Sequence, residues 1–148
     1  MHFLGFNYRI TDIQCALGLS QLNKLGNFIK RRRKIARLYR EAFNGMDEIE
    51  CLNEKEYVES SWHIFPIRVK KNRDEIFNRL RSKGIGVNVH YIPIYYHPYY
   101  KRLGYKKGLC PKAEKYYKET VTLPLYIKMS NSEIERVAKL TKRVVSNL

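Results

Sequence analysis

Apolar side chains recur at helical spacing through the first third of the chain, and this pattern predicts one long helix over residues 12–43. The positions that share this spacing are Ile13, Ala16, Leu17, Leu22, Leu25, Phe28, Ile35, Leu38, Tyr39 and Phe43. Thr11 and Gln14 stand three residues apart, as a capping box at a helix start requires. A straight helix of this length would measure about 48 Å. We therefore expect a kink or short break at Gly26–Asn27, and an element that bridges two domains.

Beyond this helix the apolar period changes, and residues 44–148 predict a small α+β domain. Strands are expected at 49–52, 62–69, 87–91 and 121–125, and helices at 73–83, at 111–119 and from a second capping box at Ser130 and Glu133 onward. Pro66 lacks an N–H group, so its strand should lie at a sheet edge or contain a bulge. We expect three or four short strands with helices on one face, and residues 1–11 as a loop that enters from an upstream domain.

Charge is the unusual bulk property, because 29 Lys and Arg residues against 14 Asp and Glu residues give a net charge of +15. Such an excess favours anionic partners, whether nucleic acid, an acidic membrane surface or a phosphorylated small molecule. The densest run spans residues 30–34 and continues with Arg37 and Arg40. On a helix these side chains point in several directions. Three interpretations stay open: a solvated helix face, a surface for a phosphate-rich partner, and a contact with an acidic protein surface.

Other bulk features limit the class of protein. A length of 148 residues suits one domain with its own core, and a hydrophobic share of 44% excludes wholesale disorder. The sequence has no apolar run of about 18 residues, so we expect no membrane span, and its start does not resemble a secretory signal. Cys15, Cys51 and Cys110 are too scattered for a disulfide framework or a zinc site. We expect a cytoplasmic protein.

The segment Gly5-Phe6-Asn7-Tyr8-Arg9 is the first candidate site. It places an amide and a guanidinium group just before a predicted helix N-terminus. An anion bound there would meet the side chains of Asn7 and Arg9 and free backbone N–H donors. The alternative is that Asn7 and Arg9 only organise the loop.

The second candidate site surrounds His90, within residues 84–93. On the predicted strand His90 shares a face with Asn88, and neighbouring tyrosines such as Tyr91 and Tyr95 offer stacking faces and hydroxyl groups. The alternative is an ordinary, partly buried histidine with a backbone partner. The histidines lack metal-ligand spacing, and the sequence has no nucleophile elbow. No lysine stands out as a Schiff-base residue, so we expect no catalytic residue in this chain.

Taken in order, several segments resemble the DegT/DnrJ/EryC1/StrS family of sugar aminotransferases. They are residues 5–9, 12–18, 21–22, the arginine-rich stretch with Tyr39, residues 89–95, and residues 123–125 with the final helix. The likeness covers nearly the whole chain. Within the family, His97-Pro98-Tyr99-Tyr100, Cys110-Pro111 and Ala113-Glu114 are most similar to transaminases that aminate a UDP-linked 4-keto-6-deoxy hexosamine.

The resemblance implies the small C-terminal domain of a fold-type I pyridoxal-phosphate (PLP) enzyme, with a short, mainly antiparallel sheet. It implies a homodimer that uses glutamate as amino donor and a nucleotide sugar as acceptor. In that family the residue matching Asn7 reaches the phosphate of the PLP held by the other subunit, and the residue matching Arg9 lies beside it. The residues matching His90 and Tyr91 lie on the nucleotide-sugar side of the cleft.

The family's large N-terminal domain, with its cofactor pocket and Schiff-base lysine, has no counterpart in the sequence. We therefore expect the C-terminal part of an enzyme, inactive as an isolated chain, which binds PLP only with the missing domain. The absent lysine position also separates the family's transaminases from its dehydratases, so both chemistries stay open. From other classes, the alternatives are a small basic nucleic-acid-binding domain and an interaction domain. Nucleic acid is not favoured, because no known binding motif accompanies the charge.

Overall fold

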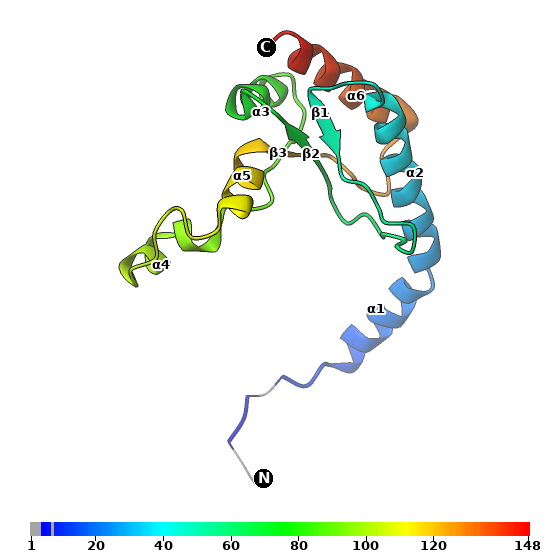
Figure 1. The fold of residues 1–148 in the computed structure, drawn as a ribbon. Coiled ribbons are helices and arrows are strands. Elements are labelled where there is room, and N and C mark those ends of the chain that lie inside the picture. Colours follow the sequence, from blue (N-terminus) through cyan, green and yellow to red (C-terminus); the bar gives the residue numbers. More distant parts are fainter. Residues whose placement is uncertain (1–3, 7) are drawn as a thin grey trace.

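A computed structural model describes residues 4–6 and 8–148. Two consecutive helices lead from the N-terminal side of the chain to its sheet (Figure 1). They are α1, Asp12–Leu22, and α2, Leu25–Phe43. The break lies at Asn23–Lys24, before the predicted Gly26–Asn27, and Gly26 is inside α2. The Lys24 N–H donates to the Gln21 carbonyl at 3.0 Å, which is a tighter, three-residue closure of the last turn. Both linking residues keep right-handed helical angles, so the chain bends without reversing.

A three-stranded antiparallel sheet forms the centre of the domain, which confirms the α+β class. Its strands are β1, Ile49–Cys51, β2, Phe65–Val69, and β3, Thr120–Leu123, in that spatial order. The expected strand at 87–91 is reduced to one bridge between Asn88 and Thr122 at the outer edge of β3.

Pro66 lies in the central strand, so the expectation of an edge strand or a bulge was wrong. Thr122 opposes Pro66 across the sheet, but Thr122 directs both its N–H and its carbonyl toward Asn88. The Pro66–Thr122 pair is therefore a non-hydrogen-bonded pair, and the nitrogen of Pro66 faces the β1 side. The β1 ladder ends at the pair Cys51–Ile67, so a proline one residue earlier removes no ladder hydrogen bond.

The hydrophobic core fills the space between one face of the sheet and three helices, α2, α3 (Arg73–Ser82) and α6 (Asn131–Ser146). The largest fully buried side chains include Tyr39, Phe65, Ile67, Leu80 and Ile134. Tyr39 donates a hydrogen bond to the Pro124 carbonyl at 2.8 Å, which ties α2 to the segment after β3.

The opposite sheet face is polar, and α5, Pro111–Glu119, lies on that side. Arg68 of β2 pairs there with Glu50 at 2.8 Å and also with Glu119, the last residue of α5. The prediction of helices on one face therefore holds for α2, α3 and α6, whereas α5 departs from it. Between β2 and α5 the chain also forms a projecting segment with η1, Ile94–Tyr96, and α4, Pro98–Arg102 (Figure 1).

Four arginines of α2 donate hydrogen bonds to backbone carbonyls of distant coil. The pairs are Arg31 with Met129, Arg32 with Trp62 and His63, Arg33 with Ser60, and Arg40 with Leu52. The Arg40 guanidinium also lies 4.6 Å from the centroid of the Trp62 ring. These arginines are half-buried supports of the coil before β2 and of the start of α6, a role that none of the three interpretations of the basic run included.

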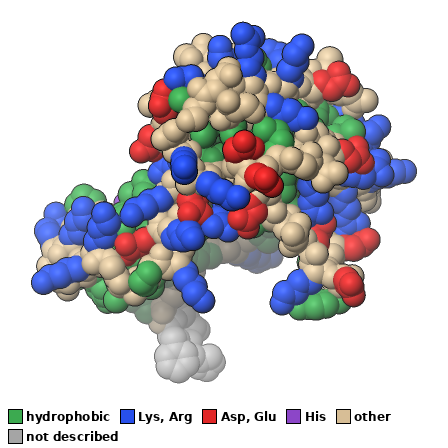
Figure 2. Space-filling model, turned by 45° about the horizontal axis from the view of Figure 1, so that its top comes forward, with side chains coloured by type: hydrophobic (Ala, Val, Ile, Leu, Met, Phe, Trp, Pro, Cys, Tyr) green, Lys and Arg blue, Asp and Glu red, His purple; other side chains and the backbone are tan. Residues whose placement is uncertain are grey.

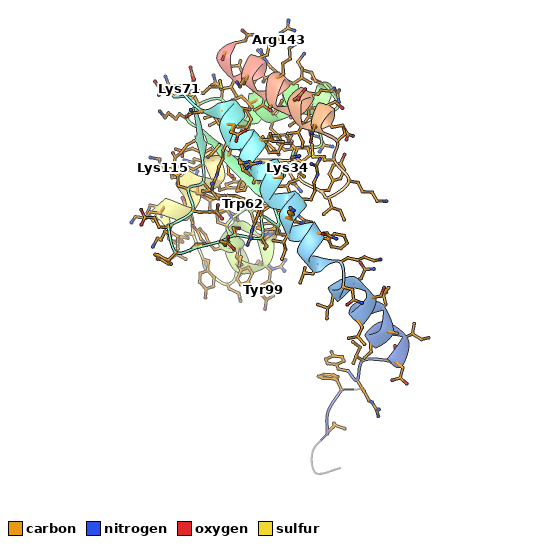
Figure 3. All side chains as sticks on the ribbon, turned by 90° about the vertical axis from the view of Figure 1, so that its right-hand side faces the viewer. Lys34, Trp62, Lys71, Tyr99, Lys115 and Arg143 are labelled. Atoms are coloured by element: carbon orange, nitrogen blue, oxygen red, sulfur yellow. The ribbon has the colours of Figure 1, made fainter. Side chains whose placement is uncertain are left out.

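Only part of the basic run is solvated as expected. Lys30, Lys34 and Arg37 are exposed, and Lys34 is labelled on the outer side of α2 in Figure 3. Elsewhere, Lys and Arg side chains spread over much of the visible surface, with Asp and Glu among them (Figure 2). Among residues 4–6 and 8–148, no helix combines the length and apolar character that crossing a membrane requires.

Candidate functional site

The N-terminal arm, described for residues 4–6 and 8–11, and helix α1 project away from the sheet (Figure 1). Thr11 caps α1 as expected, because its side chain accepts from the Gln14 N–H at 3.3 Å while its own N–H donates to Gln14 Oε1 at 3.0 Å. Arg9, two residues earlier, is exposed. Asn7 lies outside the described residues, so the predicted pairing of Asn7 and Arg9 around an anion stays a prediction.

His90 is anchored to the polar face of the sheet. The backbones of Asn88 and Thr122 exchange two hydrogen bonds, with N···O distances of 3.1 and 2.7 Å. Two residues further on, His90 Nδ1 lies 2.9 Å from the side-chain oxygen of Thr122. Its Nε2 lies 3.5 Å from the side-chain nitrogen of Asn88. Both ring nitrogens thus meet side chains, where an ordinary structural histidine was expected to have a backbone partner.

Tyr91 stands beside this histidine and faces solvent. Its ring meets the His90 ring edge-on, with centroids 4.6 Å apart and planes at 78°. Tyr91 is 69% exposed, whereas His90 is half-buried. The two predicted substrate residues are therefore brought together, one anchored and one open to a ligand.

A buried carboxylate organises the projecting segment next to this pair. Glu114 of α5 accepts hydrogen bonds from the Tyr95 hydroxyl at 2.8 Å and from the Gly108 N–H at 2.6 Å. Burial raises the pKa of Glu114, but these hydrogen bonds outweigh it and hold the pKa below its usual range. Burial also raises the pKa of Tyr95 to about 12, and the hydrogen bond to Glu114 acts in the same direction.

The segment before α1, which contains Arg9, leads away from the sheet (Figure 1), whereas His90 contacts Thr122 of β3. The sequence missed the roles of Thr122 and Glu114. Strand alternation placed Thr122 on the face opposite Val121 and Leu123, but the absence of regular pairing at 87–91 hid its contact with His90. No local signal near Glu114 indicates that Tyr95 lies against it.

The sequence and the fold have clear counterparts among known proteins. The chain belongs to the DegT/DnrJ/EryC1/StrS aminotransferase family, whose model matches residues 1–142. The spore coat polysaccharide biosynthesis protein SpsC of Bacillus subtilis is 35% identical over 95% of this chain and 38% of its own length. The UDP-4-amino-4,6-dideoxy-N-acetyl-beta-L-altrosamine transaminase of Campylobacter jejuni is 36% identical over 86% of this chain and 35% of its own length.

A solved structure shows the same similarity in sequence and also in fold. The PLP form of a putative sugar aminotransferase from Streptococcus pneumoniae is 35% identical, with a TM-score of 0.89, over 94% of this chain and 36% of that protein. The chain therefore spans between a third and two fifths of the length of these relatives.

Among the described residues, the chemistry of Arg9 fits a phosphate group such as that of PLP. The exposed Arg9 guanidinium, next to the start of α1, matches the charge of a phosphate group. Asp12, in the first turn of α1, adds an opposing negative charge. A single exposed cation fits a phosphate group and does not enclose a cofactor ring.

Proposed function

We propose that this chain is the C-terminal part of a PLP-dependent sugar-nucleotide aminotransferase, which moves an amino group from glutamate to a UDP-linked 4-keto-6-deoxy sugar. The observation that carries the proposal is the family match over residues 1–142, combined with coverage of little more than a third of each relative. The substrate assignment follows the Campylobacter relative and the likeness of residues 97–100 to such transaminases.

In this proposal the chain divides into three parts. Residues 1–11 are the loop that enters from a large PLP domain, residues 12–43 bridge the two domains, and residues 44–148 form the small domain. Apolar side chains on all sides of α1 support the bridging role. Ile13 and Leu17 lie on one side of the helix, 82% and 61% exposed, whereas Leu19 and Leu22 lie on the opposite side, 65% and 61% exposed. A helix that is apolar all round belongs in a buried setting, which a large domain and a second subunit would supply.

Each site residue has a separate task. Asn7 and Arg9 hold the phosphate of the PLP bound in the other subunit of a homodimer, and thereby fix its orientation. His90 and Tyr91 lie on the nucleotide-sugar side of the cleft. Bound PLP supplies the electron sink through which the amino group is transferred. The proton-transfer groups and the Schiff-base lysine belong to the large domain, so the chain contributes binding and orientation.

A reconstitution experiment tests the proposal. The chain is mixed with a lysine-bearing N-terminal domain of the family, and visible absorbance of bound PLP and amino transfer from glutamate to the UDP-sugar are measured. We expect both signals only in the mixture, and poor PLP binding by this chain alone. An amino sugar as product supports a transaminase, whereas a deoxygenated sugar would assign a dehydratase. Tight stoichiometric PLP binding by the isolated chain, or a mixture without either signal, contradicts the proposal.

Two variants, assayed in this mixture, test the PLP-binding role of Arg9 and the sugar-binding role of Tyr91 separately. Arg9→Ala should weaken PLP binding because it removes a cation from the phosphate, with little change in the KM for the sugar. Tyr91→Ala should raise the KM for the sugar and leave the absorbance of bound PLP unchanged. Lys34→Ala, on the exposed face of α2, serves as the matched control and should alter neither quantity.

A further inference from the structure

The orientation of the Asn88 amide is fixed by its neighbour in the chain. The Val89 N–H donates to the side-chain oxygen of Asn88 at 2.8 Å. Turning the amide around would place an NH₂ group against this N–H, with two donors facing each other. The nitrogen of the amide therefore points the other way, toward His90 Nε2 at 3.5 Å.

This orientation assigns the proton on His90. An amide nitrogen carries only donors, so His90 Nε2 must be the acceptor in this pair. A neutral imidazole has one donor and one acceptor nitrogen, which leaves the proton on Nδ1. Thr122 Oγ1, 2.9 Å from Nδ1, then accepts it. The three side chains form a directed chain from Asn88 through His90 to Thr122.

We propose that Asn88 and Thr122 hold His90 as the neutral Nδ1–H tautomer, and that His90 is a positioning residue whose role is to orient Tyr91 toward the ligand. Both ring nitrogens of His90 are occupied within the chain, so neither is free for a new hydrogen bond. The Tyr91 ring packs edge-on against His90, with centroids 4.6 Å apart, and this exposed tyrosine is the group left to meet a ligand. The tautomer stands independently of the proposed function, whereas the ligand contact of Tyr91 rests on it.

The tautomer is tested by ¹⁵N NMR of the histidine rings in this chain, with the His90 signals assigned by their loss in His90→Gln. We expect a pyrrole-like shift at Nδ1 and a pyridine-like shift at Nε2. Asn88→Asp replaces the donor with an acceptor and keeps the bond from Val89, so it should place a proton on Nε2. In Thr122→Val the Nδ1–H tautomer of His90 should no longer dominate the spectrum, and in Thr122→Ser it should dominate again.

Thr120 provides a matched control on the same strand face. Its side-chain oxygen is buried without a hydrogen-bond partner, so Thr120→Val removes a hydroxyl group that His90 does not use. Thr120→Val should leave the His90 spectrum unchanged. A pyrrole-like Nε2 in the unaltered chain, or an Asn88→Asp variant that keeps the original tautomer, would overturn the assignment.

The positioning role is tested in the mixture with the lysine-bearing domain, by adding the UDP-sugar. We expect the His90 Nε2 signal to stay pyridine-like, while Tyr91→Ala raises the KM for the sugar. A large change of the Nε2 signal on sugar binding would show direct contact with the ligand and refute the positioning role. If the mixture binds no sugar, the proposed function and the positioning role toward this ligand both fail, while the NMR result on the chain still decides the tautomer.

Discussion

Glu114 shows how one residue can hold a long projecting segment in place. The residue is 7% exposed, and its carboxylate accepts hydrogen bonds from Tyr95 near the start of the segment and from Gly108 near its end. The Tyr95 hydroxyl also accepts from the Cys110 N–H at 3.2 Å. A single charge thus joins the two ends of the stretch that begins directly after His90 and Tyr91.

Replacing Glu114 should loosen this segment in a pH-dependent way. The folded-state pKa of Glu114 is lowered, so its ionised form contributes stability above the unfolded-state value of about 4.3 and loses it as the pH falls through the folded-state pKa. Glu114→Gln should therefore speed hydrogen exchange of the Gly108 amide at neutral pH. The difference from the unaltered chain should shrink below about pH 4. Equal exchange rates at neutral pH would show that the charge does not hold the segment.

At the scale of elements, two capping boxes of the same chemistry have different surroundings. Ser130 and Glu133 cap α6, whose inner side is buried in the core, while Thr11 and Gln14 cap α1, which has no buried residue. Ser130→Ala should lower the free energy of unfolding by about 1 kcal/mol in urea denaturation. Thr11→Ala should lower helicity in circular dichroism without moving the urea midpoint. Equal effects of the two variants on that midpoint would mean that α1 unfolds with the core.

The arginines of α2 give a second test at this scale. Arg32→Ala removes the donor to two carbonyls, Trp62 and His63, and should cost about 1.5 kcal/mol of stability, because hydrogen bonds from charged groups exceed neutral ones. Lys34→Ala, two positions along the same run but exposed, should stay within about 0.5 kcal/mol. Thermal unfolding at two salt concentrations distinguishes a specific bond from general charge repulsion. An effect of Lys34→Ala as large as that of Arg32→Ala would contradict the distinction between the half-buried arginines and the exposed basic residues of α2.

The sequence predicted elements well where local signals were strong. The helix at 111–119 begins with a proline and has the predicted bounds, and α6 follows its capping box at Ser130. Sequence analysis failed where contacts between residues far apart in the chain determine the structure. The backbone carbonyls that accept from these four α2 arginines lie 12 to 98 residues away, so the run alone resembles a solvated face. Pro66 fits the central strand because the backbone of Thr122 bonds to Asn88, and the local sequence does not reveal these hydrogen bonds.

For the whole molecule, the site was less accessible to sequence analysis than the fold. The α+β class follows from periodicity, but the pairing of His90 with Thr122 requires the spatial order of β3 and residue 88. Family resemblance supplied the names of the site residues, and the structure supplied the contacts of His90 and Tyr91.

The exposed apolar surface of α1 should make the chain associate with itself when it is alone. Leu17→Lys combined with Leu22→Lys removes two large apolar side chains from opposite sides of the helix. Burial of each is worth about 1.5–3 kcal/mol, so association should weaken by more than about tenfold in sedimentation velocity. Thermal unfolding of the core should not change, because α1 has no buried residue. Unchanged association would place the self-contact elsewhere on the chain.

The arrangement of the sheet also has a consequence for biosynthesis. β2 needs β3 as its second neighbour, and the buried residues of α2 need α6, which lies about a hundred residues later in the chain. While the ribosome is still producing residues before β3, Tyr39 has neither the Pro124 carbonyl nor the apolar side of α6. The nascent α2 therefore keeps its apolar side uncovered until α6 emerges, and chaperones have their longest opportunity to bind before that point.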